Sequence, residues 1–142
     1  MQSQPAILLI DDNAIQAATR QTILRRAGYF VLAALNPQRA LEQLRDKTLG
    51  EEIGLVITDH IMPIMNGCEF VKHLRQVAPT LPVLVISGMA QAECEYDGMN
   101  VHFRVKPLPP PELLELVKTI LGEGTATLGE VQFEKSPKQN AT

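Results

Sequence analysis

The 142-residue chain has few cysteines, no long apolar run and no excess of basic residues. Its two cysteines, Cys68 and Cys94, form no C-x-x-C or metal-ligand spacing, which favours free thiols in a reducing cytosol. No stretch is apolar for the length of a membrane span, and the N-terminus lacks a basic region followed by a long apolar one. We therefore expect a cytoplasmic protein that does not bind membranes.

The charge balance argues against a general nucleic-acid-binding role. The formal net charge is −3, whereas binding to nucleic acid needs a basic excess. Arg20, Arg25 and Arg26 gather on one predicted helix, but this pattern is more typical of a solvated helix face than of a binding patch. Apolar residues make up 45% and charged residues 20%, a balance that fits one soluble globular domain.

Short apolar runs alternate with stretches of helical periodicity along the chain. Strands are predicted at 6–10, 29–34, 55–58, 81–86 and 101–105. Helices are predicted at 13–27, from the Asn36-Pro37 start onward, at 67–77 and at 110–121, with a short or distorted helix within 89–98. The first helix is expected to have one inward side, formed by Ile15, Ala18, Thr22 and Ile23.

Continuous apolar strands are typical of strands buried on both faces, which are found in parallel sheets covered by helices. Five strand–helix units therefore predict an α/β fold with a doubly wound, five-stranded parallel sheet. Right-handed crossovers favour the strand order 2-1-3-4-5.

Four of the predicted strands end in a chemically useful polar residue. Asp11 and Asp12 follow the first strand, Asp59 the third, Ser87 the fourth and Lys106 the fifth. An aspartate after a strand is most often a turn former or a helix cap, so each acid alone is weak support for a site. The carboxyl ends of parallel strands meet at one edge of the sheet, however, and ligands bind there. The combination therefore predicts a functional site.

The charges at this edge need a compensating cation. Asp11, Asp12 and Asp59 together with Lys106 leave two net negative charges in one crevice, where like carboxylates raise one another's pKa. Oxygen ligands without a Cys or His pattern predict Mg²⁺, which favours one or two carboxylates, water and a phosphate oxygen. The residues thus indicate a metal site suited to phosphate.

At these residues the sequence resembles the receiver domain of two-component response regulators, of the chemotaxis-regulator type. The matching motifs are Asp11-Asp12, D-H-I-M-P-I-M-N-G at 59–67, Ser87 and Lys106-Pro107. The resemblance covers about residues 5–121 and implies the flavodoxin-like receiver fold for that domain. Residues 122–142 are expected to be a C-terminal tail, either flexible or forming a small hairpin.

The resemblance implies a role for each matching residue. Asp59 is the expected phospho-acceptor, a carboxylate nucleophile that becomes an aspartyl phosphate. Asp12 and Asp59 are expected to bind Mg²⁺ directly, Asp11 through water, and the backbone carbonyl of Ile61 is expected to complete the protein ligands. Lys106 is expected to pair with the phosphate as a point charge.

The resemblance also implies a conformational switch. The Ser87 hydroxyl is expected to assist phosphoryl transfer and to donate to a phosphoryl oxygen, which draws its loop inward. Phe103 lies three residues before Lys106, where the family carries an aromatic switch residue; without a hydroxyl, Phe103 would switch by packing alone. Ile61 and Met89 are apolar and flank the expected path of a hydrolytic water, which predicts slow self-dephosphorylation.

Such a receiver would take its phosphoryl group from a sensor histidine kinase or a histidine phosphotransfer protein and signal to a downstream partner that the sequence does not name. It would not be an ordinary enzyme, because it catalyses only its own phosphorylation and dephosphorylation. Stand-alone receiver and receiver part of a hybrid kinase both stay open, as does a homodimer. Two other functions stay open: a Mg²⁺-dependent phosphohydrolase with an aspartate nucleophile, and a pseudo-receiver that serves only as an interaction module.

Overall fold

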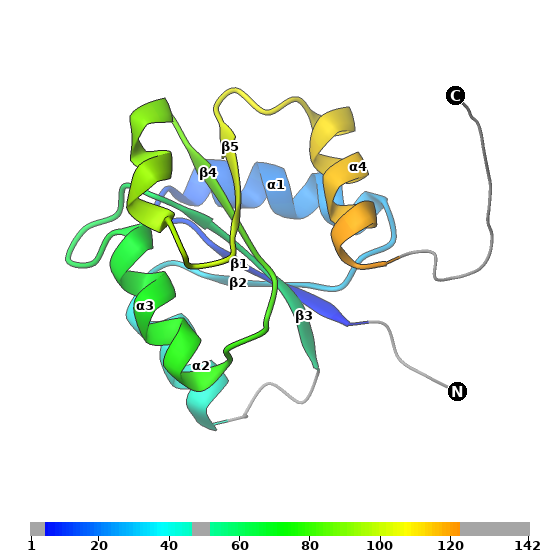
Figure 1. Cartoon of the computed structure of the whole chain (residues 1–142). Helices are drawn as coiled ribbons and strands as arrows, with labels where there is room; N and C mark the ends of the chain where they lie inside the picture. Colours follow the sequence, from blue (N-terminus) through cyan, green and yellow to red (C-terminus); the bar gives the residue numbers. More distant parts are fainter. Residues whose placement is uncertain (1–4, 47–51, 123–142) are drawn as a thin grey trace. The chain divides into compact units, whose positions relative to one another are not determined.

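Figure 1 shows a computed structural model of the chain, which describes residues 5–46 and 52–122. The chain divides into two compact units, Met1–Leu108 and Pro109–Thr142. The first unit contains a parallel sheet with helices on both faces, and the second contains one helix. The predicted tail or hairpin lies, from residue 123 onward, outside the described residues.

The five strands of the first unit are parallel and lie in the order β2-β1-β3-β4-β5, which confirms the predicted doubly wound sheet. Every residue of β1 and β4 is buried, as expected for strands covered on both faces. The strands are β1 (Ala6–Ile10), β2 (Val31–Ala34), β3 (Ile53–Asp59), β4 (Val83–Ser87) and β5 (His102–Val105). Asp59 and Ser87 are therefore the last residues of their strands rather than the first residues after them.

Helices α2 and α3 lie side by side on one face of the sheet and α1 covers the other (Figure 1). The helices of the first unit are α1 (Ala14–Arg26), α2 (Pro37–Asp46), α3 (Gly67–Val77) and the 3-10 helix η1 (Ala90–Tyr96). The second unit contains α4 (Pro110–Ile120). The segment with the weakest sequence pattern thus forms a short 3-10 helix. Within the described residues, no helix is both long and apolar enough to cross a membrane.

Asparagine residues cap the N-termini of α1 and α3, the two helices that follow the strands ending at the predicted site. The Asn13 side chain accepts from two backbone N–H groups of the first turn of α1, at 3.0 Å each. Asn66 and Glu69 form a capping box at the start of α3. Each cap contributes about 1 kcal/mol. They also define where the loops after β1 and β3 end, so both loops remain at the edge of the sheet.

The predicted inward side of α1 is wrong. Ile15 is 78% exposed, while the buried residues of this helix are Ala17 and Leu24. Ala18 and Thr22 are also exposed. The helix has no broad apolar stripe because its inner side also carries polar side chains that reach the edge of the sheet.

Candidate functional site

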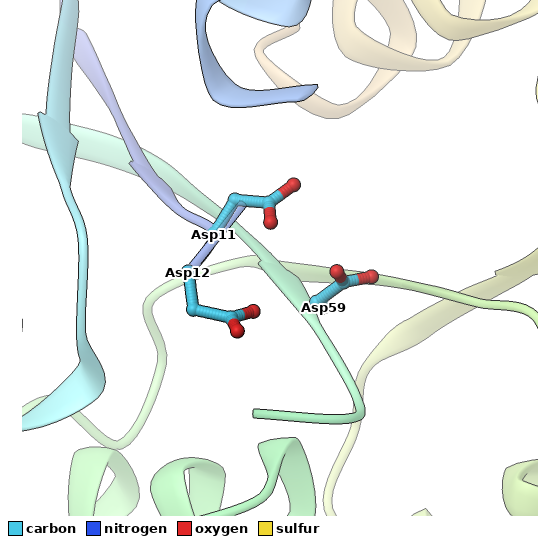
Figure 2. A group of neighbouring side chains, drawn as sticks. All are labelled: Asp11, Asp12 and Asp59. Carbon is cyan, nitrogen blue, oxygen red and sulfur yellow. The ribbon is translucent and has the colours of Figure 1, made fainter. Parts of the chain in front are cut away.

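Three carboxylates meet where β1 and β3 end. One oxygen from each of Asp11, Asp12 and Asp59 lies within 4.8 Å of the other two, and Figure 2 shows the three side chains around a common space. Asp11 and Asp59 are buried and Asp12 is exposed. The strand register explains why Asp11 and Asp59 lie close together. Ile10 of β1 pairs with Thr58 of β3, and the residue that follows each of them is an aspartate. The structure thus brings the three predicted acids together.

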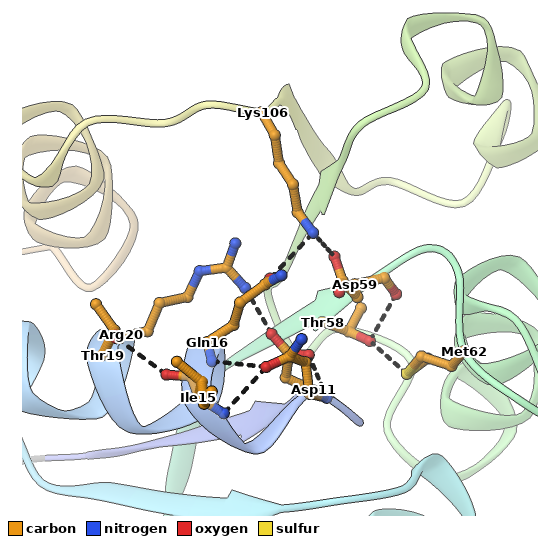
Figure 3. A network of polar contacts seen from close by, with 10 residues as sticks. Asp11, Ile15, Gln16, Thr19, Arg20, Thr58, Asp59, Met62 and Lys106 are labelled. Carbon is orange, nitrogen blue, oxygen red and sulfur yellow. Dashed lines mark hydrogen bonds and ion pairs between the residues drawn. The ribbon is translucent and has the colours of Figure 1, made fainter.

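Lys106 reaches the same cluster from the far side of β4. Its Nζ lies 2.8 Å from Asp59 Oδ1 and donates a 3.2 Å hydrogen bond to Gln16 Oε1 (Figure 3). The backbone N–H of Lys106 donates to the Ser87 carbonyl at 2.7 Å, which holds its main chain to the end of β4. A long side chain is needed here, because β4 separates Lys106 from the strand that carries Asp59.

Arg20 is a member of the site that the sequence interpretation missed. Its Nη1 donates to Asp11 Oδ2 at 3.1 Å, and only 14% of its side chain is exposed (Figure 3). The prediction of a solvated face is therefore wrong for this arginine. Gln16 and Arg20 are four residues apart and therefore share one side of the helix, but this spacing does not show what that side faces.

Several opposing effects determine the pKa of Asp11. Burial raises the pKa of Asp11, and the Asp59 charge adds to this rise. The backbone N–H of Asn13, which donates to Asp11 Oδ1 at 2.9 Å, and the cations Arg20 and Lys106 lower that pKa without cancelling the rise. With Arg20 included, the three acids and two cations leave one net negative charge, rather than the two expected from the sequence.

A pocket of about 290 Å³ opens beside the carboxylates. The Ser87 hydroxyl is buried in its wall and accepts the backbone N–H of Met89 at 2.9 Å. The lining residues are Asp12, Asn13, Gln16, Asp59, Ile61, Ser87, Gly88 and Lys106. Metal-binding and phosphate-binding candidates from the ends of four strands, β1, β3, β4 and β5, thus share one open space.

The model of the response regulator receiver domain family matches residues 7–118. The chain belongs to this family. The receiver is 32% identical to the putative two-component response regulator ARR21 of Arabidopsis thaliana, over 91% of this chain and 21% of that protein. It is 29% identical to the autoinducer 1 sensor kinase/phosphatase LuxN of Vibrio campbellii, over 83% of this chain and 13% of that protein. The receiver spans about a fifth or less of the length of these relatives.

Solved structures confirm the flavodoxin-like receiver fold. A CheY-like response regulator receiver domain protein from Methanospirillum hungatei JF-1 matches with a TM-score of 0.77 and 25% identity, over 85% of this chain and 96% of that chain. Receivers of this family are phosphoryl-accepting signalling modules rather than classical enzymes.

Two further side chains of the receiver, His60 after β3 and Phe103 on β5, lie inside the fold. Phe103 on β5 is buried, with its ring centroid 5.7 Å from that of Tyr96. His60 is also buried, and its Nδ1 lies 2.6 Å from the Tyr96 hydroxyl. The sequence interpretation missed the His60–Tyr96 pair, because the two residues are 36 positions apart and no local pattern links them.

Proposed function

We propose that this receiver accepts a phosphoryl group on the carboxylate of Asp59, with Mg²⁺, and signals by the change of conformation that follows. One observation carries the proposal: Asp59 lies between the Lys106 ammonium and two further carboxylates, at an open pocket of about 290 Å³. A nucleophile, a phosphate-binding cation and hard oxygen ligands are what phosphoryl transfer needs. We assign this activity to the domain at residues 5–121.

The donor set fits a divalent cation. Three carboxylates and two cationic side chains leave one net negative charge, and oxygen ligands suit Mg²⁺. We assign Asp12, Asp59 and the backbone carbonyl of Ile61 as direct ligands. Asp11 would bind through water, because Arg20 and a backbone N–H already occupy its two oxygens. When bound, the ion neutralises charge on the phosphoryl oxygens.

The reaction transfers a phosphoryl group from a histidine nitrogen of the donor to a carboxylate oxygen of Asp59. An Asp59 oxygen forms the new bond to phosphorus while the bond from phosphorus to the donor histidine nitrogen breaks, and that nitrogen keeps the electron pair. Lys106 stabilises the charge on the transferred group, and the Ser87 hydroxyl donates to a phosphoryl oxygen in place of the Met89 carbonyl, to which it now donates at 3.5 Å. The contacts with the phosphoryl oxygens exist only in the phosphorylated protein, so they shift a two-state conformational equilibrium.

We propose a sensor histidine kinase or a histidine phosphotransfer protein as the phosphodonor and a cytoplasmic location for the exchange. Similarity to LuxN, which is named a sensor kinase/phosphatase, supports a kinase as partner. The downstream partner is expected to be a protein, because the net charge of −3 does not favour direct contact with nucleic acid.

Acetyl phosphate with Mg²⁺ tests the proposal. We expect intact-mass spectrometry to show one added phosphoryl group that hydroxylamine removes, and none in Asp59→Asn. Asp97→Asn, the same change at an exposed acid that lines a different pocket, is the matched control and should be phosphorylated like wild type. Continuous turnover of a phosphate ester would instead indicate the phosphohydrolase, and no reaction of either kind would indicate the pseudo-receiver.

A further inference from the structure

Tyr96, the last residue of η1, has its hydroxyl inside the fold. The side chain is buried, and its hydroxyl lies 2.6 Å from His60 Nδ1, with the two rings edge-to-face at a centroid distance of 5.5 Å. The other ring nitrogen of His60, Nε2, faces Glu95 Oε2 at 3.7 Å. We assign the imidazole proton to Nε2 for this reason, so the Tyr96 hydroxyl donates to Nδ1. Both ring nitrogens of His60 thus face η1.

A second contact holds η1 to the start of α3. The Cys68 thiol donates to the Glu95 carbonyl at 3.3 Å. Gly67, next to Cys68, leaves space for the tyrosine: a Cβ at this position would collide with the Tyr96 hydroxyl and lie 2.7 Å from the Asp59 carbonyl oxygen. The Tyr96 hydroxyl and the Asp59 carbonyl therefore both border the space beside Gly67 that a Cβ would fill.

The Tyr96 ring also contacts β5. Its ring packs on that of Phe103 at 5.7 Å with an interplanar angle of 48°. Phe103 pairs with Val85 of β4, two residues before Ser87. Tyr96 and Phe103 both line a surface hollow of about 400 Å³ that also includes the exposed acids Glu93 and Asp97.

We propose that Tyr96 is a positioning residue, whose hydrogen bond to His60 couples the phosphorylation state of Asp59 to η1, Phe103 and the hollow they line. This inference rests on the proposed function, because it requires that Asp59 changes state. His60 shares a peptide bond with Asp59, so a shift of the Asp59 main chain moves the imidazole. The buried hydrogen bond transmits this movement to the Tyr96 ring, which packs on the ring of Phe103.

The composition of the chain provides a spectroscopic test. There is no tryptophan and there are two tyrosines, so Tyr29→Phe leaves Tyr96 as the sole tyrosine, whose emission is selected by exciting at wavelengths that phenylalanine does not absorb. Beryllofluoride with Mg²⁺ serves as a stable phosphoryl mimic. We expect its addition to change the Tyr96 emission in this background. His60→Leu should abolish most of the change, and His60→Asn, whose Oδ1 can accept from the hydroxyl, should restore it.

A second measurement separates coupling from a purely structural role. If the Tyr96–His60 hydrogen bond differs in strength between the free and the beryllofluoride-bound protein, removal of that bond must also change the affinity for beryllofluoride. We expect Tyr96→Phe, which removes one oxygen atom, to change the beryllofluoride Kd about fivefold by calorimetry. His60→Leu should have no additional effect in that variant. If His60→Leu does not fold, the beryllofluoride Kd values of Tyr96→Phe and His60→Asn test the coupling instead.

The failure of the coupling is distinguishable from the failure of the proposed function. Absence of both beryllofluoride binding and acetyl phosphate labelling in wild type would reject the proposed function. Normal labelling with an unchanged Kd in Tyr96→Phe, or a full emission change in folded His60→Leu, would reject the coupling alone. A loss of unfolding free energy in Tyr96→Phe without any change in Kd would likewise reject it, because that is the result of a structural role.

Discussion

Arg20 donates to Asp11 at 3.1 Å, and the carboxylate it binds is completely buried. Removing the cation leaves a buried charge without its ion-pair partner, so Arg20→Met should lower the free energy of unfolding by about 3 kcal/mol. Methionine keeps the apolar stem of the side chain. Arg39→Met is the control, because the Arg39–Glu42 pair is exposed on both sides and contributes no more than about 0.5 kcal/mol. Urea denaturation measures both; equal losses in the two variants would contradict this account.

The raised pKa of Asp11 predicts a pH-dependent effect of Asp11→Asn in metal-free buffer. Burial raises the pKa of Asp11 in the folded state above its ordinary value of 3.8, so the folded protein binds this proton more tightly than the unfolded chain. Below pH 3.8 the group is protonated in both states and costs nothing. As the pH rises through the folded pKa, ionisation progressively destabilises the wild type.

Asp11→Asn should therefore gain stability relative to wild type as the pH rises over that range. Denaturation curves in a chelator at a series of pH values measure the difference. A difference that is constant, or that shrinks as the pH rises, would show that Asp11 does not carry the cost of burial.

Lys106→Met should act on phosphoryl transfer and on metal binding in opposite directions. Loss of the ammonium 2.8 Å from Asp59 removes a stabilising charge from the transferred group, so labelling by acetyl phosphate should slow by about 10²–10³-fold. The same loss leaves the acids with more net negative charge, so Mg²⁺ should bind more tightly. Lys118→Met, at an exposed lysine of α4, is the control. Weaker Mg²⁺ binding together with slower labelling would indicate damage to the site rather than lost charge.

Arg75 holds four carbonyl groups from two parts of the chain. Its guanidinium donates to the backbone carbonyls of Ala78, Leu81, Met99 and Asn100, at distances between 2.7 and 3.2 Å. Arg75→Lys should lower the free energy of unfolding by about 2–4 kcal/mol, because a single ammonium cannot replace the planar fork. Arg26→Lys, at an exposed position near the end of α1, should cost almost nothing in the same urea titration. Similar values for both would exclude this role.

The apolar side chain of Ile61 predicts that a phosphoryl group on Asp59 is hydrolysed slowly. Its side chain is 62% exposed and lines the pocket beside Asp59, where an apolar group gives a hydrolytic water no hydrogen bond. Ile61→Asn should shorten the lifetime of the labelled protein several-fold, whereas Ile61→Leu should leave it unchanged. Loss of label after removal of acetyl phosphate measures the lifetime. A wild-type lifetime of seconds with Mg²⁺ would contradict the prediction.

Much of the fold and of the candidate site follows from the sequence, because both depend on local patterns. Apolar runs separate strands buried on both faces from amphipathic helices, and asparagine followed by a helical stretch indicates where a helix begins. Parallel strands share one carboxyl edge, so residues at strand ends, such as Asp12, Asp59 and Lys106, are expected at one site from the order of the elements alone. That prediction needs only the element order and the chain direction.

The tertiary structure decided which faces meet. The sequence pattern of Arg20 is that of a surface residue, because nothing local shows that the inner side of α1 faces Asp11. Likewise, Tyr96 meets His60 across 36 residues only because a short 3-10 helix turns its last side chain toward the end of β3. Periodicity determines the type of an element, whereas the partner of a polar side chain depends on long-range packing geometry, which a single sequence does not contain.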